Sequence, residues 1–485
     1  MSILKQIKKV SDVVWELPRG ISEGMLVPAR VYATEQLLGQ MEESVFKQIV
    51  NVAKLPGIIK YSFCMPDGHT GYGFPIGGVA AMSPEDGVIS PGGIGFDINC
   101  GMRLVLTNLT EEDVKPRLKE LVDKLFEHVP CGVGCKGFVR LSKKEFRTVV
   151  EQGAVWCVNN GFGWQEDLER TEEGGSMRGA DSRDVSERAI TRGYDQIGTL
   201  GSGNHYLEIQ VAKQENIFDK DLAEQFGINI PNQVVVMFHC GSRGFGHQIA
   251  SDYLQLFLKV MEKKYGLKIL DRELSAAPFK SSEGQAYFSA MKCAVNMAFA
   301  NRQVILHRIR EVFSEVFGKS AKDLGMRQVY DVAHNIAKLE TYIIDGKKQQ
   351  LLIHRKGATR ALAPEMPGLP DVYKKTGQPV IIGGSMETGS YLLVGQDSSA
   401  ETFYSTAHGS GRLMSRAQAK KRFHGRTLLE QLRQRGIYID TASYSGLAEE
   451  AGAAYKNIDD ITLTTELAGI SKRVVKFVPI GNIKG

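Results

Sequence analysis

The 485-residue chain has no continuous apolar stretch of about 18 residues, the length at which a membrane-spanning helix is expected. At the N-terminus, Lys5, Lys8 and Lys9 are not followed by the apolar segment of a secretory signal. The sequence therefore indicates a soluble protein that is not exported. We expect it in the cytoplasm, without a membrane partner.

Cysteine is also sparse, with seven residues in the whole chain. An odd and widely spaced set argues against a disulfide framework and for a reducing compartment. Cys131 and Cys135 are close in sequence, but no second pair lies nearby to complete a structural zinc site. We expect these two cysteines to be small buried or loop residues.

A large excess of charge of either sign is missing as well, since the formal net charge is +5. A nucleic-acid partner would therefore have to bind local basic clusters. The content of 42% hydrophobic and 24% charged residues is ordinary for a globular protein, and the length alone would allow two or three domains. Because no low-complexity linker or repeat divides the chain, we predict a single domain over residues 1–485.

Short apolar runs and two helical patterns define the expected secondary structure. Residues 114–126 and 282–317 carry apolar side chains at helical spacing. Strands and helices mix without a regular βαβ order, which favours an α+β domain built round a central mixed sheet. The acidic stretch 166–184 is expected to form an exposed excursion. Buried strands are expected at 77–82, 102–106, 234–238, 351–354 and 380–382.

Glycine, in contrast, is abundant at 52 residues and is concentrated in a few loops that also carry histidine or cysteine. Glycine serves where the backbone takes a positive φ or approaches a ligand closely, so phosphates or metals are expected at these loops. Scattered ligands of mixed softness favour a metal centre with open positions over a closed structural zinc site. The five sites are Asp97 to Cys100, Asn204-His205, Phe238 to Cys240, Ala333 to Asn335 and Ala407 to Gly409.

His408 lies in a glycine-rich segment, and residues 413–421 after it are predicted to be helical. A glycine-rich turn before a helix directs backbone N–H groups at an anion, so we expect a phosphate beside His408. Arg412, Arg416 and Lys420 would then share one helical face. That face is either a track for RNA phosphates or a solvated charged surface.

Two further basic segments are candidate anion sites. The first contains His354, Arg355, Lys356 and Arg360, and we predict that it binds a terminal phosphate or a sulfate-like anion. A salt-bridged strand end is the alternative. The second follows His239 and contains Ser242, Arg243 and His247, of which Arg243 is the better phosphate candidate.

Seven segments contain these residues in a fixed order. They are PGGIGFDINCG (Pro91 to Gly101), LGSGNHYLE (Leu200 to Glu208), HCGSRGFGH (His239 to His247), DVAHN (Asp331 to Asn335), HRKGATRA (His354 to Ala361), GGSM (Gly383 to Met386) and HGSGR (His408 to Arg412). The ordered set resembles the RtcB family of RNA-splicing ligases. Each motif alone is weak, but the resemblance covers nearly the whole chain, through the closing Ile483-Lys484-Gly485.

The resemblance implies a pair of divalent metal ions, usually manganese, with Cys100 bridging them. Asp97 and His205 would complete the protein ligands of one ion, and His239 and His334 those of the other. A carboxylate and neutral imidazoles suit manganese, whereas a thiolate alone would favour zinc, which is the main rival metal. Asn204 and Asn335 adjoin these ligands and are expected to orient a ligand or a phosphate, with turn stabilisation as the alternative for Asn335.

The resemblance also implies that His408 attacks the α-phosphate of GTP and holds GMP as a phosphoramidate. GMP then passes to an RNA 3′-phosphate, and a 5′-hydroxyl displaces it to join the strands. A 2′,3′-cyclic phosphate is first hydrolysed to the 3′-phosphate. The implied guanylate site consists of Asn204, His205, Tyr206, Leu207, Glu208, His334, Asn335, Gly383, Gly384, Ser385, Met386, Ser390, His408, Gly409, Ser410, Gly411 and Lys484.

Some of these residues have a stated role. Glu208 is expected to accept hydrogen bonds from guanine N1–H and the 2-amino group, which adenine cannot donate. Tyr206 is a candidate for stacking on the base, and Tyr455 for a further contact. Lys484 is expected to contact the nucleotide while adding little to stability, since chain ends are usually frayed.

Three positions depart from the family pattern: Gly383 replaces a proline, Glu387 a glycine and Ser410 an alanine. The first two change the expected loop geometry. The implied partners are RNA, as tRNA halves or broken strands, and archease as an activating protein. Two other functions remain open: a two-metal phosphoesterase that activates water, and an RNA-binding protein with a structural metal. Neither needs the guanylate residues Glu208, His408 and Lys484.

Overall fold

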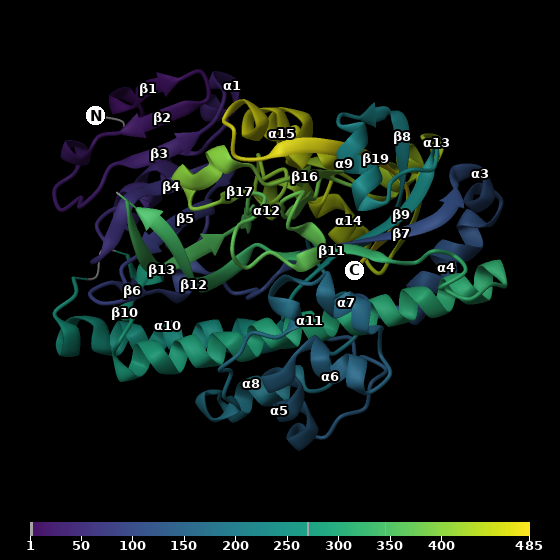
Figure 1. Ribbon diagram of the computed structural model, residues 1–485, viewed down its shortest axis with the longest axis horizontal. Helices are drawn as coiled ribbons and strands as arrows, with labels where there is room; N and C mark the ends of the chain where they lie inside the picture. The colour runs from purple at the N-terminus through teal and green to yellow at the C-terminus, as the bar shows by residue number, and fades with distance from the viewer. Residues whose placement is uncertain (1–2, 269–270, 345) are drawn as a thin grey trace.

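The computed structural model describes residues 3–268, 271–344 and 346–485, and its strands form two large sheets above a layer of helices (Figure 1). The expected α+β class is confirmed, with the strands divided between two mixed sheets. Within the described ranges, no helix combines the length and apolar character needed to cross a membrane.

The first sheet has seven strands in the order β1-β2-β3-β4-β5-β13-β12, of which β3 and β4 run parallel and the other neighbours antiparallel. Its strands are β1 (Lys8–Ser11), β2 (Val14–Leu17), β3 (Ala29–Tyr32), β4 (Ile58–His69), β5 (Ile76–Met82), β13 (Lys347–Lys356) and β12 (Asn335–Ile344).

The second sheet follows the order β11-β7-β9-β8-β19-β16-β15, and β18 pairs in parallel with β19. Its strands are β11 (Gln328–Ala333), β7 (Gly101–Thr110), β9 (Gln233–Cys240), β8 (Tyr206–Ile217), β19 (Lys472–Lys484), β16 (Ser390–Val394), β15 (Pro379–Ile382) and β18 (Tyr438–Thr441). Two small pairs join β6 (Val88–Ile89) to β10 (Ala277–Pro278) and β14 (Ala358–Arg360) to β17 (Ser405–Ala407). Each of the five apolar runs predicted to be strands lies inside β5, β7, β9, β13 or β15.

The long helix α11 (Ser282–Phe317) runs beneath both sheets, and the smaller helices α5, α6 and α8 cover its other side (Figure 1). Its bounds are those predicted. Ser281 caps its first turn by accepting from the backbone N–H of Gly284, and Gly318 ends it in the left-handed region at φ 64°. Because packed elements surround it, polar side chains such as Asn301 and Gln303 are buried and hydrogen-bonded rather than solvated.

The predicted helix 114–126 is broken at its start. Residues Lys115–Arg117 form a 3-10 turn between α3 and α4, because Pro116 lacks a backbone N–H and begins a new helical segment. The helices are α1 (Glu35–Gly39), α2 (Glu43–Val52), α3 (Glu111–Val114), α4 (Leu118–His128), α5 (Lys143–Gln152), α6 (Ala154–Asn159), α7 (Gln165–Glu169), α8 (Glu187–Gly193), α9 (Lys220–Phe226), α10 (Arg243–Tyr265), α11, α12 (Arg416–Arg422), α13 (Gly425–Gln434), α14 (Tyr444–Glu449) and α15 (Ile458–Leu467).

The stretch 166–184 is only partly exposed, contrary to the expected excursion. Asp167 is 1% exposed and accepts two hydrogen bonds of 2.7 Å from the Arg310 guanidinium on α11. Glu172 is also 1% exposed and lies 2.6 Å from the Lys338 ammonium on β12. The acidic residues are buried because they face basic partners on the elements beneath them, which the local sequence does not reveal.

Replacing Asp167 with Ala should therefore destabilise the fold by roughly 3–5 kcal/mol, because the Arg310 guanidinium would be left buried and unpaired. Chemical denaturation would measure the change in the free energy of unfolding. Glu169→Ala, in the same segment but exposed, is the control and should change stability by no more than about 0.5 kcal/mol. Equal losses in both variants would show that the Asp167 pair does not anchor the segment.

Candidate active site

A cavity of about 280 Å³ opens where strand ends of the two sheets meet. Ile76 and Lys356 contribute from the first sheet, and Tyr206, His239 and Lys484 from the second. The remaining walls are loops, including those before β7 and after β15 and β17. Residues that are far apart in sequence are thus brought to one place by the sheet topology.

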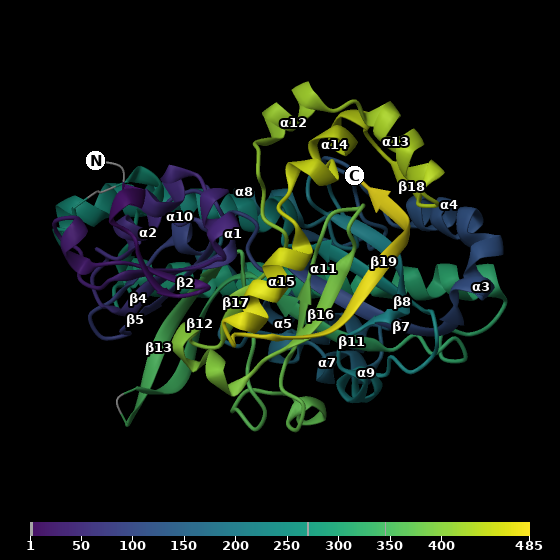
Figure 2. The ribbon, with the colours of Figure 1, turned by 90° about the horizontal axis from the view of Figure 1, so that it is seen from above.

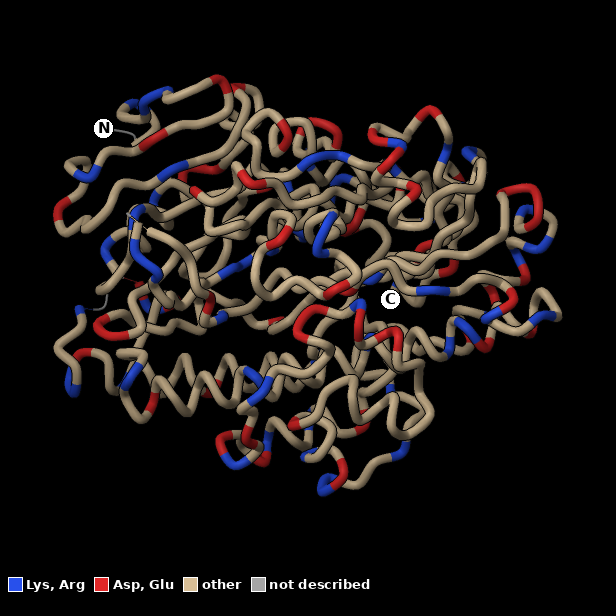
Figure 3. The backbone as a smooth tube through the Cα atoms, viewed as in Figure 1, with Lys and Arg blue, Asp and Glu red and all other residues tan. Residues whose placement is uncertain are grey.

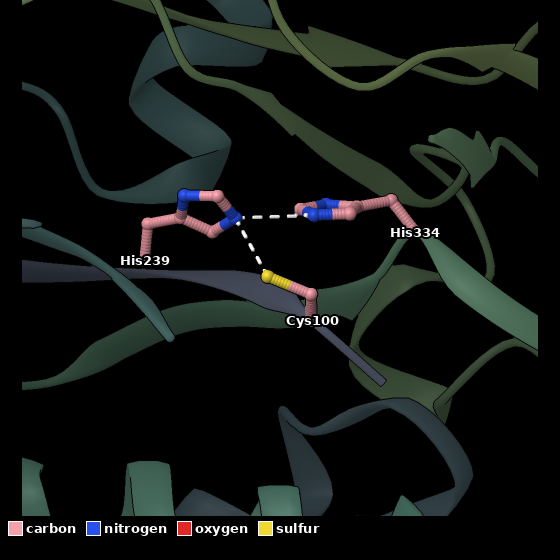
Figure 4. Close-up of side chains that lie close together, drawn as sticks. All are labelled: Cys100, His239 and His334. Carbon is pink, nitrogen blue, oxygen red and sulfur yellow. Dashed lines mark hydrogen bonds between the residues drawn. The ribbon is translucent and has the colours of Figure 1, made fainter. Parts of the chain in front are cut away.

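The five predicted metal ligands converge at this cavity. Cys100 Sγ lies 3.0 Å from His239 Nε2 and 3.4 Å from His205 Nε2. His205 Nε2 is 2.8 Å from a carboxylate oxygen of Asp97, and His239 Nε2 is 3.1 Å from His334 Nε2. Figure 4 shows Cys100, His239 and His334 pointing toward one another from three different segments.

The ligand atoms fall into two overlapping groups, Cys100 with His239 and His334, and Cys100 with Asp97 and His205. Within each group the atoms lie no more than 4.8 Å apart. Cys100 is the member common to both, as a bridging thiolate requires. The grouping is the one that the resemblance implies.

The surroundings of these side chains suit cations. His239 Nδ1 donates to the carbonyl oxygen of Asn204 at 3.0 Å, so its Nε2 presents a lone pair to the centre. The Nε2 atom of His334 lies 3.1 Å from it, so one ring can donate to the other, or both can turn lone pairs to a cation bound between them. Asp97 Oδ1 and His334 Nδ1 are buried without a hydrogen-bond partner among the described residues. The donor set therefore fits a pair of divalent ions of borderline softness.

Burial sets the charge states of the ligands. It holds the pKa values of His239 and His334 well below the ordinary value, so both imidazoles are neutral. Burial would raise the pKa of Asp97, but the nearby His205 and Arg243 outweigh it and lower that pKa. Burial and the Asp97 charge raise the pKa of the Cys100 thiol well above its usual range, so the thiolate needs a bound cation.

His408 is held by a carboxylate that the sequence analysis missed. Its Nδ1 lies 2.5 Å from Asp67 Oδ2, and the same oxygen accepts from the backbone N–H groups of His408 and Gly409 at 2.9 and 3.3 Å. Asp67 is fully buried near the end of β4. Burial would raise its pKa, but the charge and hydrogen bonds of His408, with Lys456, lower it. When the His408 ring is neutral, Nδ1–H donates to Asp67 and Nε2 carries the free lone pair.

The predicted helix after His408 begins later than expected, at Arg416. Its N-terminus therefore does not face His408, and Asp67 takes up the N–H groups that were expected to bind an anion. The predicted common helical face also fails for Arg412, which precedes the helix. Its guanidinium lies 3.2 Å from Glu450 Oε1, while Lys420 pairs with Glu449.

Two of the other predicted anion-binding residues are also paired with acidic groups. Arg355 donates to Glu340 at 2.7 Å, Arg360 lies 3.2 Å from Glu172, and both are buried. Arg243 lies 2.9 Å from His205 Nδ1, outside the cavity lining. Figure 3 shows Lys and Arg interspersed with Asp and Glu along the chain. The alternative of a salt-bridged segment therefore holds for Arg355 and Arg360.

Lys356 is the member of that segment that reaches the cavity. Its ammonium donates to the carbonyl oxygens of Tyr72 and Phe74, the latter at 3.1 Å. Burial lowers its pKa to about 7. His354 lies beneath it, fully buried, and accepts from the backbone N–H of Ser90 at 3.3 Å.

Most residues of the implied guanylate site line the cavity. They are Asn204, Tyr206, His334, Asn335, Gly383, Gly384, Ser385, Met386, His408, Gly409, Ser410, Gly411 and Lys484. Tyr455 also lines it. His205, Leu207, Glu208 and Ser390 lie behind the lining instead.

Glu208 is buried beside β19, where its carboxylate accepts from Gln210 Nε2 and Asn482 Nδ2, each at 2.5 Å. Burial raises its pKa to about 7. Lys484 is 4% exposed and pairs with Tyr206 on β8 and Thr441 on β18, so this end of the chain is not frayed. The expectation that Lys484 adds little to stability is therefore wrong.

The structure also shows the surroundings of Glu387 and of the two neighbouring cysteines, Cys131 and Cys135. Glu387 accepts from the backbone N–H of Gly452 at 2.8 Å and lies 2.9 Å from the Arg435 guanidinium. It thereby ties the Gly383 loop to the projecting layer of α12, α13, α14 and β18 (Figure 2). Cys131 and Cys135 are half-buried thiols in a loop, as expected.

Comparisons with known proteins cover almost the full chain. The family model described as "tRNA-splicing ligase RtcB" matches residues 48–485. The "tRNA-splicing ligase RtcB" of Thermococcus kodakarensis is 52% identical over 481 residues, and that of Archaeoglobus fulgidus 50% identical over 480, each covering 99% of both chains. The "RNA-splicing ligase RtcB homolog 1" of Entamoeba histolytica is 46% identical over 484 residues, 97% of this chain and 91% of its own. From the family match and these identities, we conclude that the chain belongs to the RtcB family.

Proposed function

We propose that this protein is a GTP-dependent RNA ligase that joins 3′-phosphate or 2′,3′-cyclic phosphate ends to 5′-hydroxyl ends. Its substrates would be tRNA halves, broken RNA or both, in the cytoplasm. The proposal is carried by one observation: the Asp67–His408 pair opens onto the same cavity as two groups of metal-ligating side chains. The names of the relatives, which are RNA-splicing and tRNA-splicing ligases, support the same class of reaction.

The proposed first step is attack of His408 Nε2 on the α-phosphorus of GTP. A P–N bond forms, the bond to the bridging oxygen of pyrophosphate breaks, and pyrophosphate leaves. Asp67 keeps the proton on Nδ1 and offsets the positive charge that develops on the ring. Asp97, Cys100, His205, His239 and His334 would hold two divalent ions, with manganese favoured, and bound ions would supply Lewis-acid stabilisation of phosphoryl charge.

The next steps transfer GMP to RNA and then release it. A 3′-phosphate oxygen attacks the phosphorus of His408–GMP, the P–N bond breaks, and a pyrophosphate linkage forms. The RNA 5′-hydroxyl then attacks the RNA phosphorus, losing its proton, and GMP leaves as a phosphodiester forms. A cyclic phosphate end must first add water to open to the 3′-phosphate.

A phosphoesterase or an RNA-binding module would not need this nucleophile. Incubation with α-labelled GTP and manganese, followed by intact-protein mass analysis, should detect one added GMP. Absence of the adduct with full metal loading would favour the phosphoesterase. Archease is the proposed activating partner, and multiple-turnover ligation with and without it tests that role.

His408→Ala should abolish the GMP adduct while leaving metal binding intact. Asp67→Asn should slow adduct formation by about 10²–10⁴-fold, because the amide donates to Nδ1 and favours the wrong tautomer. Single-turnover labelling measures both variants, with manganese titration as the control. An adduct in the His408 variant would refute the choice of nucleophile, and a normal rate in the Asp67 variant would refute its role.

Cys100→Ala should remove both high-affinity manganese sites, whereas His239→Ala should mainly weaken one, because Cys100 belongs to both ligand groups. Manganese bound per chain, measured after equilibrium dialysis, checks the difference. Cys135→Ala alters a thiol outside the cavity lining and should bind manganese normally. One intact high-affinity site in the Cys100 variant would rule out bridging.

The affinity for GTP should fall as the pH drops below about 7, by about tenfold per pH unit. Glu208 has a raised pKa, so its carboxyl is protonated below that pH and loses acceptor capacity for guanine. GTP dependence of adduct formation from pH 5.5 to 8 measures the effect, and Glu208→Gln should bind weakly with this pH dependence removed. The same slope in Glu208→Gln would assign the titration to another group.

A further inference from the structure

Three aromatic rings form a continuous row at one edge of the cavity. Tyr72 comes from the loop between β4 and β5, Phe96 from the loop before β7, and His247 from the start of α10. The rings of Tyr72 and Phe96 are 5.3 Å apart and perpendicular, while Phe96 and His247 stack at 4.9 Å with 26° between their planes. Tyr72 and Phe96 line the cavity, and His247 supports Phe96 from outside the lining.

The row lies next to the proposed reaction centre. Phe96 directly precedes Asp97, whose carbonyl oxygen accepts from Asn335 Nδ2 at 3.0 Å. The Lys356 ammonium, which donates to the Tyr72 carbonyl oxygen, adds a cation to the same edge. A phosphate held at the metal ligands would therefore have its own nucleotide close to these rings.

Three residues expected to contact the nucleotide, Tyr206, Tyr455 and Lys484, form a separate group in the cavity lining. There the Lys484 ammonium lies 5.5 Å from the Tyr206 ring and 3.6 Å from Glu450, and the Tyr455 hydroxyl donates to Glu450. In the described part of the chain, Tyr72 and Phe96 make no hydrogen bond, ion pair or ring contact with that group. Tyr72, Phe96 and His247 are therefore not among the residues assigned to binding the guanine nucleotide.

The exposure of the row also points to a ligand. Tyr72 is 55% exposed, so its ring is accessible to a ligand. His247 has its pKa lowered by partial burial and by Arg192, an exposed cation on α8. Exposed aromatic faces beside cations suit a single-stranded nucleic acid, in which bases stack while phosphates meet positive charge.

We propose that Tyr72 and Phe96, buttressed by His247, form a stacking subsite for the terminal nucleobase of an RNA strand whose end lies at the metal ligands. The proposal rests on the proposed RNA ligase function. It adds a site that holds the base itself, separate from the residues that hold guanylate and from those that hold phosphate. Stacking tolerates any base, so the subsite would position ends without selecting a sequence.

The test compares RNA binding and adduct formation in Tyr72→Ala, Tyr72→Phe and the wild type. Binding is measured without GTP, using short fluorescent RNAs with a 3′-phosphate or a 5′-hydroxyl end. Tyr72→Ala should weaken binding about 5- to 100-fold, the loss of one stacked base, and Tyr72→Phe should restore it. Tyr444→Ala alters another exposed tyrosine, outside the cavity lining, and should bind normally.

RNAs with an abasic terminal nucleotide identify the stacked end. An abasic residue at the stacked end should weaken RNA binding by the wild type to the level of Tyr72→Ala. An abasic residue at the opposite end should leave the wild type binding RNA more tightly than Tyr72→Ala. GMP adduct formation should be unchanged in Tyr72→Ala. Normal RNA binding in this variant, or an equal defect with abasic residues at either end, would overturn the proposal. Because binding is measured without chemistry, failure of the wild type to form an adduct would count against the proposed ligase and not against the subsite.

Discussion

The buried ion pair between Asp331 and Arg302 is the interaction on which the candidate site depends. Arg302, on α11, donates to both Asp331 carboxylate oxygens at 2.8 Å. It also donates to the carbonyl oxygens of Asn99 and Cys240 at 2.7 and 2.9 Å. Both charged residues are fully buried, so this bonding must offset a large desolvation cost. The Arg302 guanidinium thereby joins the loop before β7, the end of β9 and strand β11, next to the proposed ligands Cys100, His239 and His334.

The histidines of the cavity differ in the groups that bind their ring nitrogens. Burial keeps the ligand imidazoles neutral, which leaves their lone pairs available. The histidine proposed as nucleophile differs, because its ring is tied to a buried carboxylate instead of a carbonyl oxygen. A carbonyl oxygen fixes only the tautomer of a histidine. The Asp67 carboxylate fixes the tautomer of His408 and also stabilises a positive charge on its ring. His239, whose Nδ1 meets the carbonyl oxygen of Asn204, and His408, whose Nδ1 meets Asp67, thus differ in chemistry through their partners.

Apolar periodicity, which is a local signal, predicted the strands and α11. The convergence of the five ligand residues was implied only by the family resemblance. Neither signal predicted Asp67, which lies 341 residues from His408 and carries no periodic signal of its own. The Pro66-Asp67-Gly68-His69 sequence, which forms the end of β4, was the available clue. The basic segments were misjudged for the same reason: whether Arg355 meets a phosphate or Glu340 depends on the strand pairing of β12 with β13. The guanylate and metal roles of individual residues stay predictions.

The position of β19 has a consequence for how the protein is made. This strand lies between β8 and β16 within the second sheet, yet it is the last strand to leave the ribosome. Until it inserts, β8 lacks a neighbour on one side and Glu208 lacks Asn482. From the synthesis of β8 until β19 pairs with it, the nascent chain would therefore expose one unpaired, largely apolar edge of β8. Chaperones bind surfaces of this kind. The loops that carry the proposed metal ligands are synthesised before the residues of the proposed nucleotide wall.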